Sequence, residues 1–387
     1  MIHDSAIGYV SHGFVHDAGL PVISDQWIKA NFPHGRIADT EHIYLHSPCL
    51  PYWLAGLGVR LFGASDVRWL RVIPVAINSL LLFVFFQGVF SVLTDRRRQL
   101  WFIICFTAIP MGWVMLSDFS PNAYAHYILL ALVGVLLPLF HAGQPASSRS
   151  HFAVAGFYGF LAACFTWDYF FVMLMAPLAV ACLYHGERIL RDNELQRLAF
   201  NLSAFVAAGF ALAQSLHLLE VTAYYGSISH AVTELANVGR YRATGNAAGY
   251  HFLTGLTVNK PCSYCNYILK LGPLSGRLVL AWHYLISLTA SDFGGQPVLV
   301  LPVVAYLIAG AVLAGVCSDR NILYRFLALA LVSMVACFLW PMIMEDHGVA
   351  HTRLIARHFY VVYILLALLV IDGISGHLKA KDAARPF

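Results

Sequence analysis

The stretch VRWLRVIPVAINSLLLFVFFQGVFS, residues 67–91, decides the fold class of this chain. From Val72 to Ser91 it contains no charged residue. A helix of about 20 apolar residues is long enough to cross the hydrocarbon core of a bilayer. Similar apolar blocks recur along almost the whole chain. They predict nine membrane-spanning helices, at 67–91, 100–117, 122–140, 152–167, 169–185, 198–219, 297–316, 322–340 and 356–376.

The composition of the 387 residues agrees with this interpretation. The chain is 59% hydrophobic and only 11% charged, and its mean hydropathy is +0.68. Soluble domains carry about 25% charged residues, so a chain this poor in charge could not cover its surface with polar groups in water. We therefore expect an all-α, polytopic bundle of membrane-spanning helices, and we exclude a soluble globular fold.

The basic residues predict how this bundle is oriented. Short cytoplasmic loops are enriched in Lys and Arg, and this bias sets the direction of insertion. One set of connections carries most of the positive charge, at Arg96–Arg98, Arg149, Arg188, Arg191, Arg197, Arg320, Arg325, Lys379, Lys381 and Arg385. We expect these connections to be cytoplasmic and the amino-terminal segment to face outside.

The predicted spans divide a single membrane domain, residues 1–387, into five parts. We expect an outer loop with an interfacial helix, a first group of spans, a long outer loop, a second group of spans and a cytoplasmic tail, at 1–66, 67–219, 220–296, 297–376 and 377–387. The interfacial helix is expected over Pro48–Phe62, where aromatic residues stand near the start of a short apolar stretch.

Acidic residues at the outer ends of the predicted spans are the main candidates for chemistry. Asp4 lies in the first outer loop, Asp118 between two spans and Asp168 in the next outer hairpin. The alternative is that each is a solvated loop residue or a helix cap. For Asp118 this alternative is supported by Ser120-Pro121, because proline favours the first turn of a helix.

Two arginines at the opposite end of the chain suggest a phosphate site. Arg353 and Arg357 are four residues apart, so they share one face if the segment is helical. Arginine binds phosphate through paired hydrogen bonds, which fits a lipid phosphate at the outer surface. The alternative is ion pairing with Glu345 or Asp346.

A metal site is only weakly indicated by the sequence. Cys262 and Cys265 form a lone CxxC pair, for which a local disulfide is the simplest interpretation, and His42 and His46 are four residues apart. No complete ligand set of fixed spacing occurs. A divalent metal ion is therefore kept only as an optional cofactor.

The order of these motifs resembles the GT-C class of membrane glycosyltransferases, in particular the family of protein O-mannosyltransferases and bacterial aminoarabinose transferases. Short motifs along the chain carry the resemblance: His3-Asp4, His46-Ser47-Pro48-Cys49-Leu50-Pro51-Tyr52-Trp53-Leu54, Leu61-Phe62-Gly63, Arg68 and Arg71, Asp118, and Arg357-His358-Phe359-Tyr360. In the family, a Pro-Pro-aromatic segment leads into a helix beside the membrane, which ends in a Leu-Phe-Gly turn.

This resemblance implies an inverting transfer of a sugar from a polyprenyl-phosphate donor to a lipid, glycan or protein acceptor. Asp4 would be the general base, with Asp17, Asp25 or Glu41 as alternatives, and Asp118 would position the acceptor or a metal. Arg353 and Arg357 would hold the phosphate, with His46 and Tyr360 as further substrate-binding residues. The enzyme would act at the outer face of a bacterial inner membrane, among membrane lipids and without nucleic acid.

The chain also departs from the family pattern. The family has a span before its catalytic acid, whereas Met1 lies only three residues before Asp4, so we expect the first span to be missing. The family's Asp-Glu pair is Asp4-Ser5, and the second proline of its Pro-Pro pair is Cys49. Two alternatives stay open: a transporter or flippase of lipid-linked or anionic solutes, and a noncatalytic relative. Ionisable residues cluster at span ends rather than at mid-membrane depth, which favours surface chemistry.

Overall fold

The computed structural model describes residues 20–21, 48–63, 71–108, 111–118, 120–142, 149–244, 320–343, 358 and 360–372. This part of the chain is helical almost throughout, and no strand occurs in it. Its α-helices are α3 (Leu50–Phe62), α5 (Val72–Val92), α6 (Arg96–Ala108), α7 (Met111–Val114), α8 (Pro121–His141), α9 (Arg149–Phe165), α10 (Phe170–His185), α11 (Asn193–Tyr225), α12 (Ile228–Thr244), α17 (Arg320–Ile343) and an unlabelled helix, Tyr360–Asp372. Two short 3-10 helices, η1 (Met115–Ser117) and η2 (Gly186–Leu190), complete the set.

Four of the described helices are long and apolar enough to cross a membrane. They are α5, α8, α10 with the η2 turn that follows it, and α11. The predicted spans 67–91, 122–140, 169–185 and 198–219 correspond to these four helices. The all-helical class and the membrane association predicted from the sequence are thus supported.

The other predicted spans have different outcomes. Helices α9, α17 and Tyr360–Asp372 lie within or around three further predicted ranges, 152–167, 322–340 and 356–376. In the described part of the span predicted at 100–117, α6 ends at Ala108 and two separate short elements, α7 and η1, follow from Met111. The range 297–316 lies outside the described residues, so nine spans remain a prediction.

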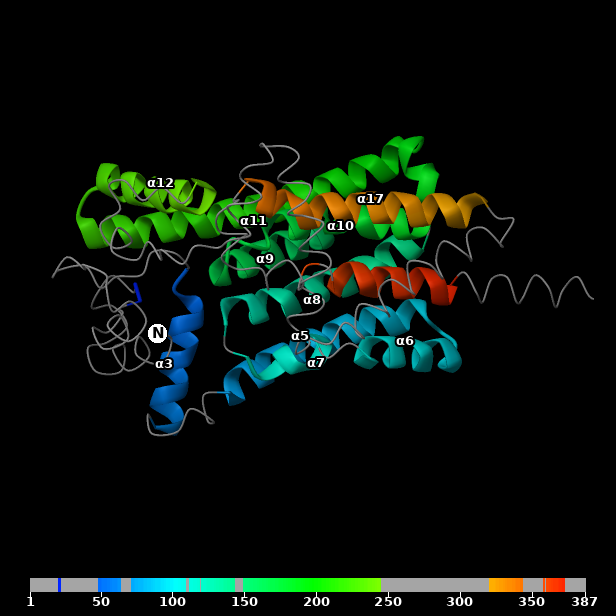
Figure 1. The fold of residues 1–387 in the computed structure, drawn as a ribbon, viewed down its shortest axis with the longest axis horizontal. Coiled ribbons are helices and arrows are strands. Elements are labelled where there is room, and N and C mark those ends of the chain that lie inside the picture. Colours follow the sequence, from blue (N-terminus) through cyan, green and yellow to red (C-terminus); the bar gives the residue numbers. More distant parts are fainter. Residues whose placement is uncertain are drawn as a thin grey trace, which may run out of the picture.

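Most of the helices run side by side along one direction, and α3 lies across that direction at one end of the bundle (Figure 1). Helix α8 is the centre of the bundle: it packs against α5, α9 and α10, and its side chains from Ala123 to Gly134 are all buried. The buried core continues from α8 into α10, α11 and the Tyr360–Asp372 helix.

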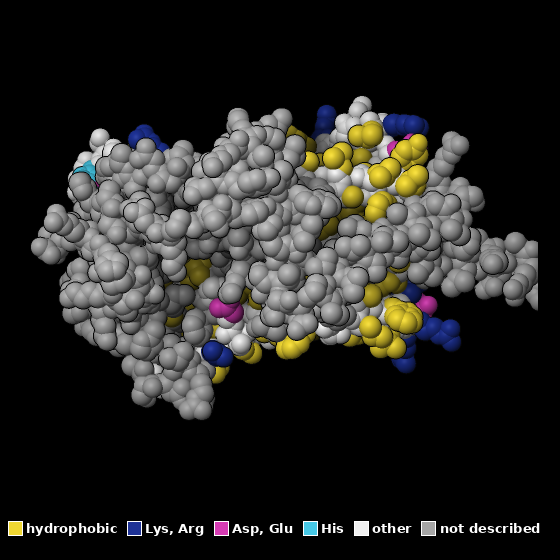
Figure 2. Space-filling view, in the orientation of Figure 1, with side chains coloured by type: hydrophobic (Ala, Val, Ile, Leu, Met, Phe, Trp, Pro, Cys, Tyr) yellow, Lys and Arg dark blue, Asp and Glu magenta, His cyan; other side chains and the backbone are white. Residues whose placement is uncertain are grey.

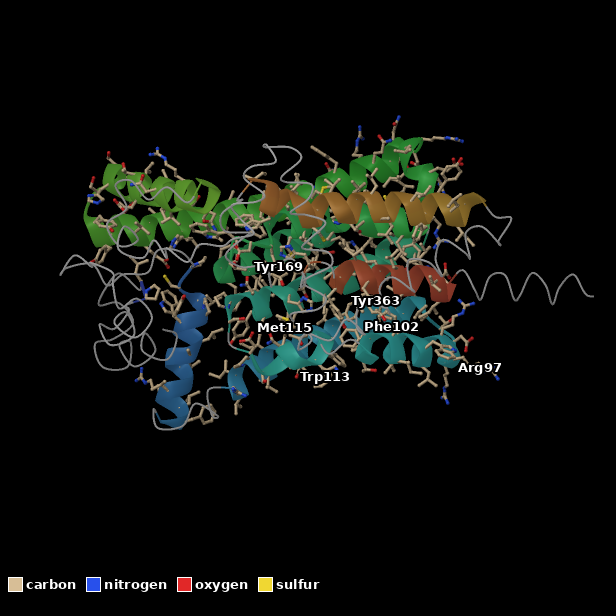
Figure 3. The ribbon with its side chains drawn as sticks, in the orientation of Figure 1. Arg97, Phe102, Trp113, Met115, Tyr169 and Tyr363 are labelled. Atoms are coloured by element: carbon tan, nitrogen blue, oxygen red, sulfur yellow. The ribbon has the colours of Figure 1, made fainter. Side chains whose placement is uncertain are left out.

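The two ends of the bundle are named here by what they contain. The arginine end comprises the starts of α6, α9, α11 and α17, together with η2, and Figure 3 shows Arg97 at this end. The α3 end comprises α3, the start of α8, the turn between α9 and α10, and the end of α11. Each end therefore collects residues that are far apart in the sequence.

Glycines allow the closest helix contacts in the bundle. A Cβ added at Gly88 of α5 would clash with the backbone of Gly134 in α8, and one at Gly209 of α11 would clash with the backbone of Gly156 in α9. Small residues at helix interfaces let backbones approach closely, which is how helices commonly associate in a bilayer. The packing is therefore of the type expected for a membrane bundle.

Many large apolar side chains of the described helices are exposed on the outside of the bundle. Large hydrophobic side chains are more than half exposed on several helices, among them Phe83 on α5, Trp101 on α6, Phe200 on α11 and Leu331 on α17. Figure 2 shows hydrophobic side chains exposed along the flanks of the molecule. Extended apolar surface of this kind marks a contact with lipid or with another protein.

The region predicted as a long outer loop, 220–296, begins as helix. Helix α11 continues to Tyr225, ends at Gly226 in a left-handed conformation (φ +66°), and is followed by α12, which packs back onto it. The 33 residues of α11 span about 50 Å at 1.5 Å per residue, which is longer than a hydrocarbon core of about 30 Å. Residues 245–296 lie outside the described part of the chain.

Candidate functional site

Three side chains of different chemistry meet at the α3 end. The Cys49 thiol precedes α3, and His217 and Glu220 lie near the end of α11. The Sγ of Cys49 is 3.2 Å from Oε2 of Glu220, and Nδ1 of His217 is 3.2 Å from the same oxygen. We call these three residues the Cys49–His217–Glu220 cluster. It connects α3 and α11 through side chains 171 positions apart in the chain.

Local sequence explains why these side chains point to one place. Leu50 and Pro51 begin α3 directly after Cys49, and proline is favoured in the first turn of a helix because it has no N–H to satisfy. The buried side of α3 includes Tyr52, Ala55 and Val59, spaced at three and four residues. His217 and Glu220 are three residues apart on α11, so they share one face of that helix.

The cluster is largely removed from solvent. Cys49 and His217 are 3% and 2% exposed, whereas the Glu220 side chain is 26% exposed. Burial, reinforced by the neighbouring Glu220 carboxylate, raises the pKa of the Cys49 thiol. The thiol is therefore protonated at neutral pH and donates its hydrogen to Glu220.

This protonation state bears on what the cluster can do. A nucleophilic cysteine needs a lowered pKa, usually from a neighbouring cation or a helix amino terminus, and a base that contacts its sulfur. Here the sulfur of Cys49 and Nδ1 of His217 both contact Oε2 of Glu220, so the carboxylate lies between the thiol and the imidazole. The geometry thus argues against a Cys–His nucleophilic pair and favours a hydrogen-bonded group that shares one carboxylate oxygen.

The turn between α9 and α10 closes the other side of this region. The Trp167 ring packs edge-on against His217, with ring centroids 5.9 Å apart, and the Tyr169 ring packs edge-on against His358 at 4.6 Å. Asp168 is only 4% exposed. The alternative of a solvated loop acid is therefore wrong for Asp168. Carboxylates are rarely buried to this extent unless other polar groups compensate them.

Asp118 lies just before α8, and its contacts fit a role at the helix start. Its Oδ2 accepts a hydrogen bond from Oγ of Ser120 at 2.7 Å, and its Oδ1 accepts one from the Ser120 backbone N–H at 2.9 Å. Ser120 is the N-cap of α8, where its Oγ accepts from the backbone N–H of Ala123 at 3.3 Å. Asp118 thus orients the capping serine, as the helix-cap alternative predicted.

Tyr360 lies inside the bundle. Its side chain is 3% exposed, and its hydroxyl donates to the backbone carbonyl of Phe106 at 3.1 Å. Its ring lies 5.3 Å from that of His126 on α8 and 5.8 Å from that of Phe106, measured between centroids. A substrate could reach Tyr360 only if this packing opened. The neighbouring Tyr363, labelled in Figure 3, makes the equivalent bond to the carbonyl of Cys105.

The other predicted site residues, Asp4, His46, Arg353 and Arg357, lie outside the described part of the chain. The structure therefore describes two of the six, Asp118 at the start of α8 and Tyr360 in the helix core. No metal was assigned to particular residues by the sequence, and the Cys49–His217–Glu220 cluster was not predicted. One sequence signal could have pointed to it, because His217 and Glu220 bring two ionisable groups to the end of one long apolar segment.

Comparison with known proteins adds no assignment. No protein-family model, no curated protein sequence and no solved structure matches this chain. The resemblance to GT-C glycosyltransferases thus stays a prediction from the sequence motifs.

Proposed function

We propose that the protein is a membrane glycosyltransferase that moves a sugar from a polyprenyl-phosphate donor to an acceptor at the α3 end. The observation that carries this proposal is the concentration of carboxyl groups at the end of the bundle where the short apolar helix α3 lies across the other helices. Asp118, Asp168 and Glu220 come from three different parts of the chain and all lie at this end.

The chemistry explains why such an end would suit this reaction. Displacing a lipid phosphate from an anomeric carbon requires a base that takes the proton of the acceptor hydroxyl. It also requires positive groups or a metal that stabilise the departing phosphate. We assign the base to Asp4 and the phosphate contacts to Arg353 and Arg357, on the motif resemblance and on their positions in the sequence. Asp118 acts as a positioning residue through Ser120.

The exposed face of α3 suits a substrate that is held in lipid. Leu57, Leu61 and Phe62 are 42%, 63% and 41% exposed, and the helix ends at Gly63, whose φ of +86° few other residues adopt. Apolar side chains on a short helix of this kind bind the boundary between headgroups and acyl chains. We propose that α3 lies in that boundary on the outer side, because the arginine end carries the charges typical of the cytoplasmic side.

The test uses the full chain reconstituted in liposomes with radiolabelled polyprenyl-phosphate hexose and pentose donors. A cell-envelope fraction of lipids and glycans supplies the acceptors. We expect label to move to an acceptor, and Asp4→Asn to reduce the rate at least about 100-fold, because general bases contribute about 10²- to 10⁴-fold. Asp118→Asn should reduce the rate less, because one oxygen still accepts from Ser120.

The matched control is Glu187→Gln, an exposed acid at the arginine end that pairs with Arg191. It should leave transfer unchanged. Full activity in Asp4→Asn would remove Asp4 as the base. The protein would instead be a flippase if the donor lipid crossed the bilayer with its sugar still attached and no sugar reached any acceptor.

A further inference from the structure

We infer that Cys49, His217 and Glu220 form a binding site for a divalent transition-metal cation, with Zn²⁺ as the best fit, that ties α3 to α11. This inference does not depend on the proposed glycosyltransferase activity, because it rests on the geometry and chemistry of three described side chains.

The distances are close to those of a tetrahedral zinc site. Bond lengths of about 2.3 Å to sulfur and about 2.0 Å to nitrogen and oxygen place the sulfur and oxygen ligands about 3.5 Å apart, and nitrogen and oxygen about 3.3 Å apart. In the cluster both separations are 3.2 Å. All three ligand atoms lie within 4.8 Å of one another, so small side-chain rotations complete the geometry.

The kinds of ligand select the metal class. Thiolate and imidazole are ligands that Zn²⁺ and similar transition metals prefer, whereas Mg²⁺ and Ca²⁺ are bound almost entirely by oxygen. A cysteine, a histidine and a glutamate together therefore favour zinc. Three protein ligands leave a fourth position, which water can fill from the side where Glu220 is partly exposed.

The hydrogen bonds of the cluster show where a cation would bind and which proton it would displace. Oε2 of Glu220 is the partner of both the Cys49 thiol and Nδ1 of His217. When Zn²⁺ binds, the S–H bond of Cys49 breaks, an S–Zn bond forms, and the proton leaves to solvent. His217 binds as the neutral ring, whose remaining proton sits on Nε2, a buried atom with no hydrogen-bond partner among the described residues. Metal binding to thiols releases protons in this way.

The binding test uses the full-length protein, purified in detergent, stripped of metal with a chelator and titrated with Co²⁺ as a spectroscopic probe. We expect one Co²⁺ per chain with a thiolate-to-cobalt charge-transfer band in the near ultraviolet, and displacement of Co²⁺ by Zn²⁺. Cys49→Ser should abolish the band. Glu220→Gln should weaken Co²⁺ binding at least tenfold.

Two controls separate this site from other thiols. Cys105→Ser changes a cysteine on α6 outside the cluster and should leave the band unchanged. The double variant Cys262→Ser/Cys265→Ser removes the CxxC pair and should also leave it unchanged. A band that survives in Cys49→Ser but disappears in the CxxC variant would assign the metal to the other pair and overturn the inference, as would the absence of any band in the wild type.

A thermal measurement covers the case in which Cys49→Ser fails to fold. A ligand that binds the native state raises the melting temperature. Zn²⁺ should therefore raise the melting temperature of the wild type and of Cys105→Ser, and Glu220→Gln should lose most of this shift. An equal shift in Glu220→Gln would contradict the site.

Discussion

Glu220 at the α3 end and Asp372 at the arginine end are similarly exposed, but their carboxylates contact different kinds of side chain. Their side chains are 26% and 35% exposed, and each receives two neighbours on its carboxylate. Asp372 lies 3.0 Å from the guanidinium of Arg325 and 3.8 Å from that of Arg98. Glu220 instead faces a thiol and an imidazole.

This difference indicates that the contacts of Asp372 at the arginine end have a structural role. Guanidinium groups keep their charge at every pH that proteins experience, so Arg325 and Arg98 remain cationic partners for the Asp372 carboxylate. Arg325 also donates to the backbone carbonyl of Leu183 at 2.6 Å, which joins α17, α10 and the Tyr360–Asp372 helix. The thiol and the imidazole beside Glu220 are both metal-ligand groups, so a cation can bind between them and the carboxylate. At the arginine end, Arg325 and Asp372 hold three helices together through ion pairs and a hydrogen bond. At the α3 end, the proposed cation would replace the hydrogen bonds of the Cys49–His217–Glu220 cluster.

The largest effect on stability is expected when the ion pairs of Asp372 are removed. Asp372→Ala leaves two guanidinium groups without their shared carboxylate, and it should cost about 2 kcal/mol, between the values for exposed and for buried pairs. The measurement is the free energy of unfolding of the purified protein in denaturant.

The matched variant at the other end is Glu220→Gln, in metal-free protein. Its amide oxygen still accepts from Cys49, so the loss should stay below about 1 kcal/mol. Equal losses for the two variants would remove the contrast between a carboxylate paired with two arginines and a carboxylate hydrogen-bonded to a thiol and an imidazole.

An intermediate effect is expected on the reactivity of Cys49. Because the carboxylate of Glu220 helps to raise the pKa of this thiol, Glu220→Gln lowers that pKa and increases the thiolate fraction. Alkylation of Cys49 at pH 8 should therefore become several-fold faster in Glu220→Gln, as followed by mass spectrometry of the modified peptide. Alkylation of Cys182, which is buried on α10, provides the internal reference. An unchanged rate would show that Glu220 does not control the thiol.

The smallest effect concerns pH at the arginine end. Backbone N–H groups of Leu195 and Glu194, together with Arg188, hold the pKa of the Asp192 N-cap below its usual value. A depressed pKa contributes stability above the unfolded value of about 3.9, and this stability is lost as the pH falls through the folded value.

The melting temperature should therefore fall below pH 4 partly through Asp192. Asp192→Asn keeps a capping oxygen but has no titrating group, so its melting temperature should depend less steeply on pH in this range. Curves of equal slope for the two proteins would exclude Asp192 from the acid transition.

Features of the fold that depend on consecutive residues could be predicted from the sequence more readily than features that depend on distant contacts. The apolar run of α5 and the Pro-aromatic start of α3 lie within single segments, and both were found as helices. The single span predicted at 100–117 instead contains the end of α6, together with α7 and η1, because an apolar run by itself does not show where one helix stops and the next begins. Asp118 was correctly connected with the start of α8, since the Asp-x-Ser-Pro pattern is also local.

The contacts at the site were not local, so the sequence alone could not predict them. Cys49 was seen only as a departure from a Pro-Pro motif, because nothing in its neighbourhood refers to Glu220. Substrate binding by Tyr360 stays a prediction, and the bond from its hydroxyl to a carbonyl 254 positions earlier in the chain could not be read from its neighbours in the sequence. Asp168 looked like a loop acid, and only the packing of the α9–α10 turn made it a buried one.

The sequence by itself determined that this is a helical chain suited to a membrane, because the length and hydropathy of a segment are properties of consecutive residues. The tertiary structure alone decided that α3 lies across one end of the bundle and that a thiol, an imidazole and a carboxylate meet there. Helix packing brings distant segments together through the shape of their surfaces, as at Gly88 and Gly134, and such shapes depend on both partners at once.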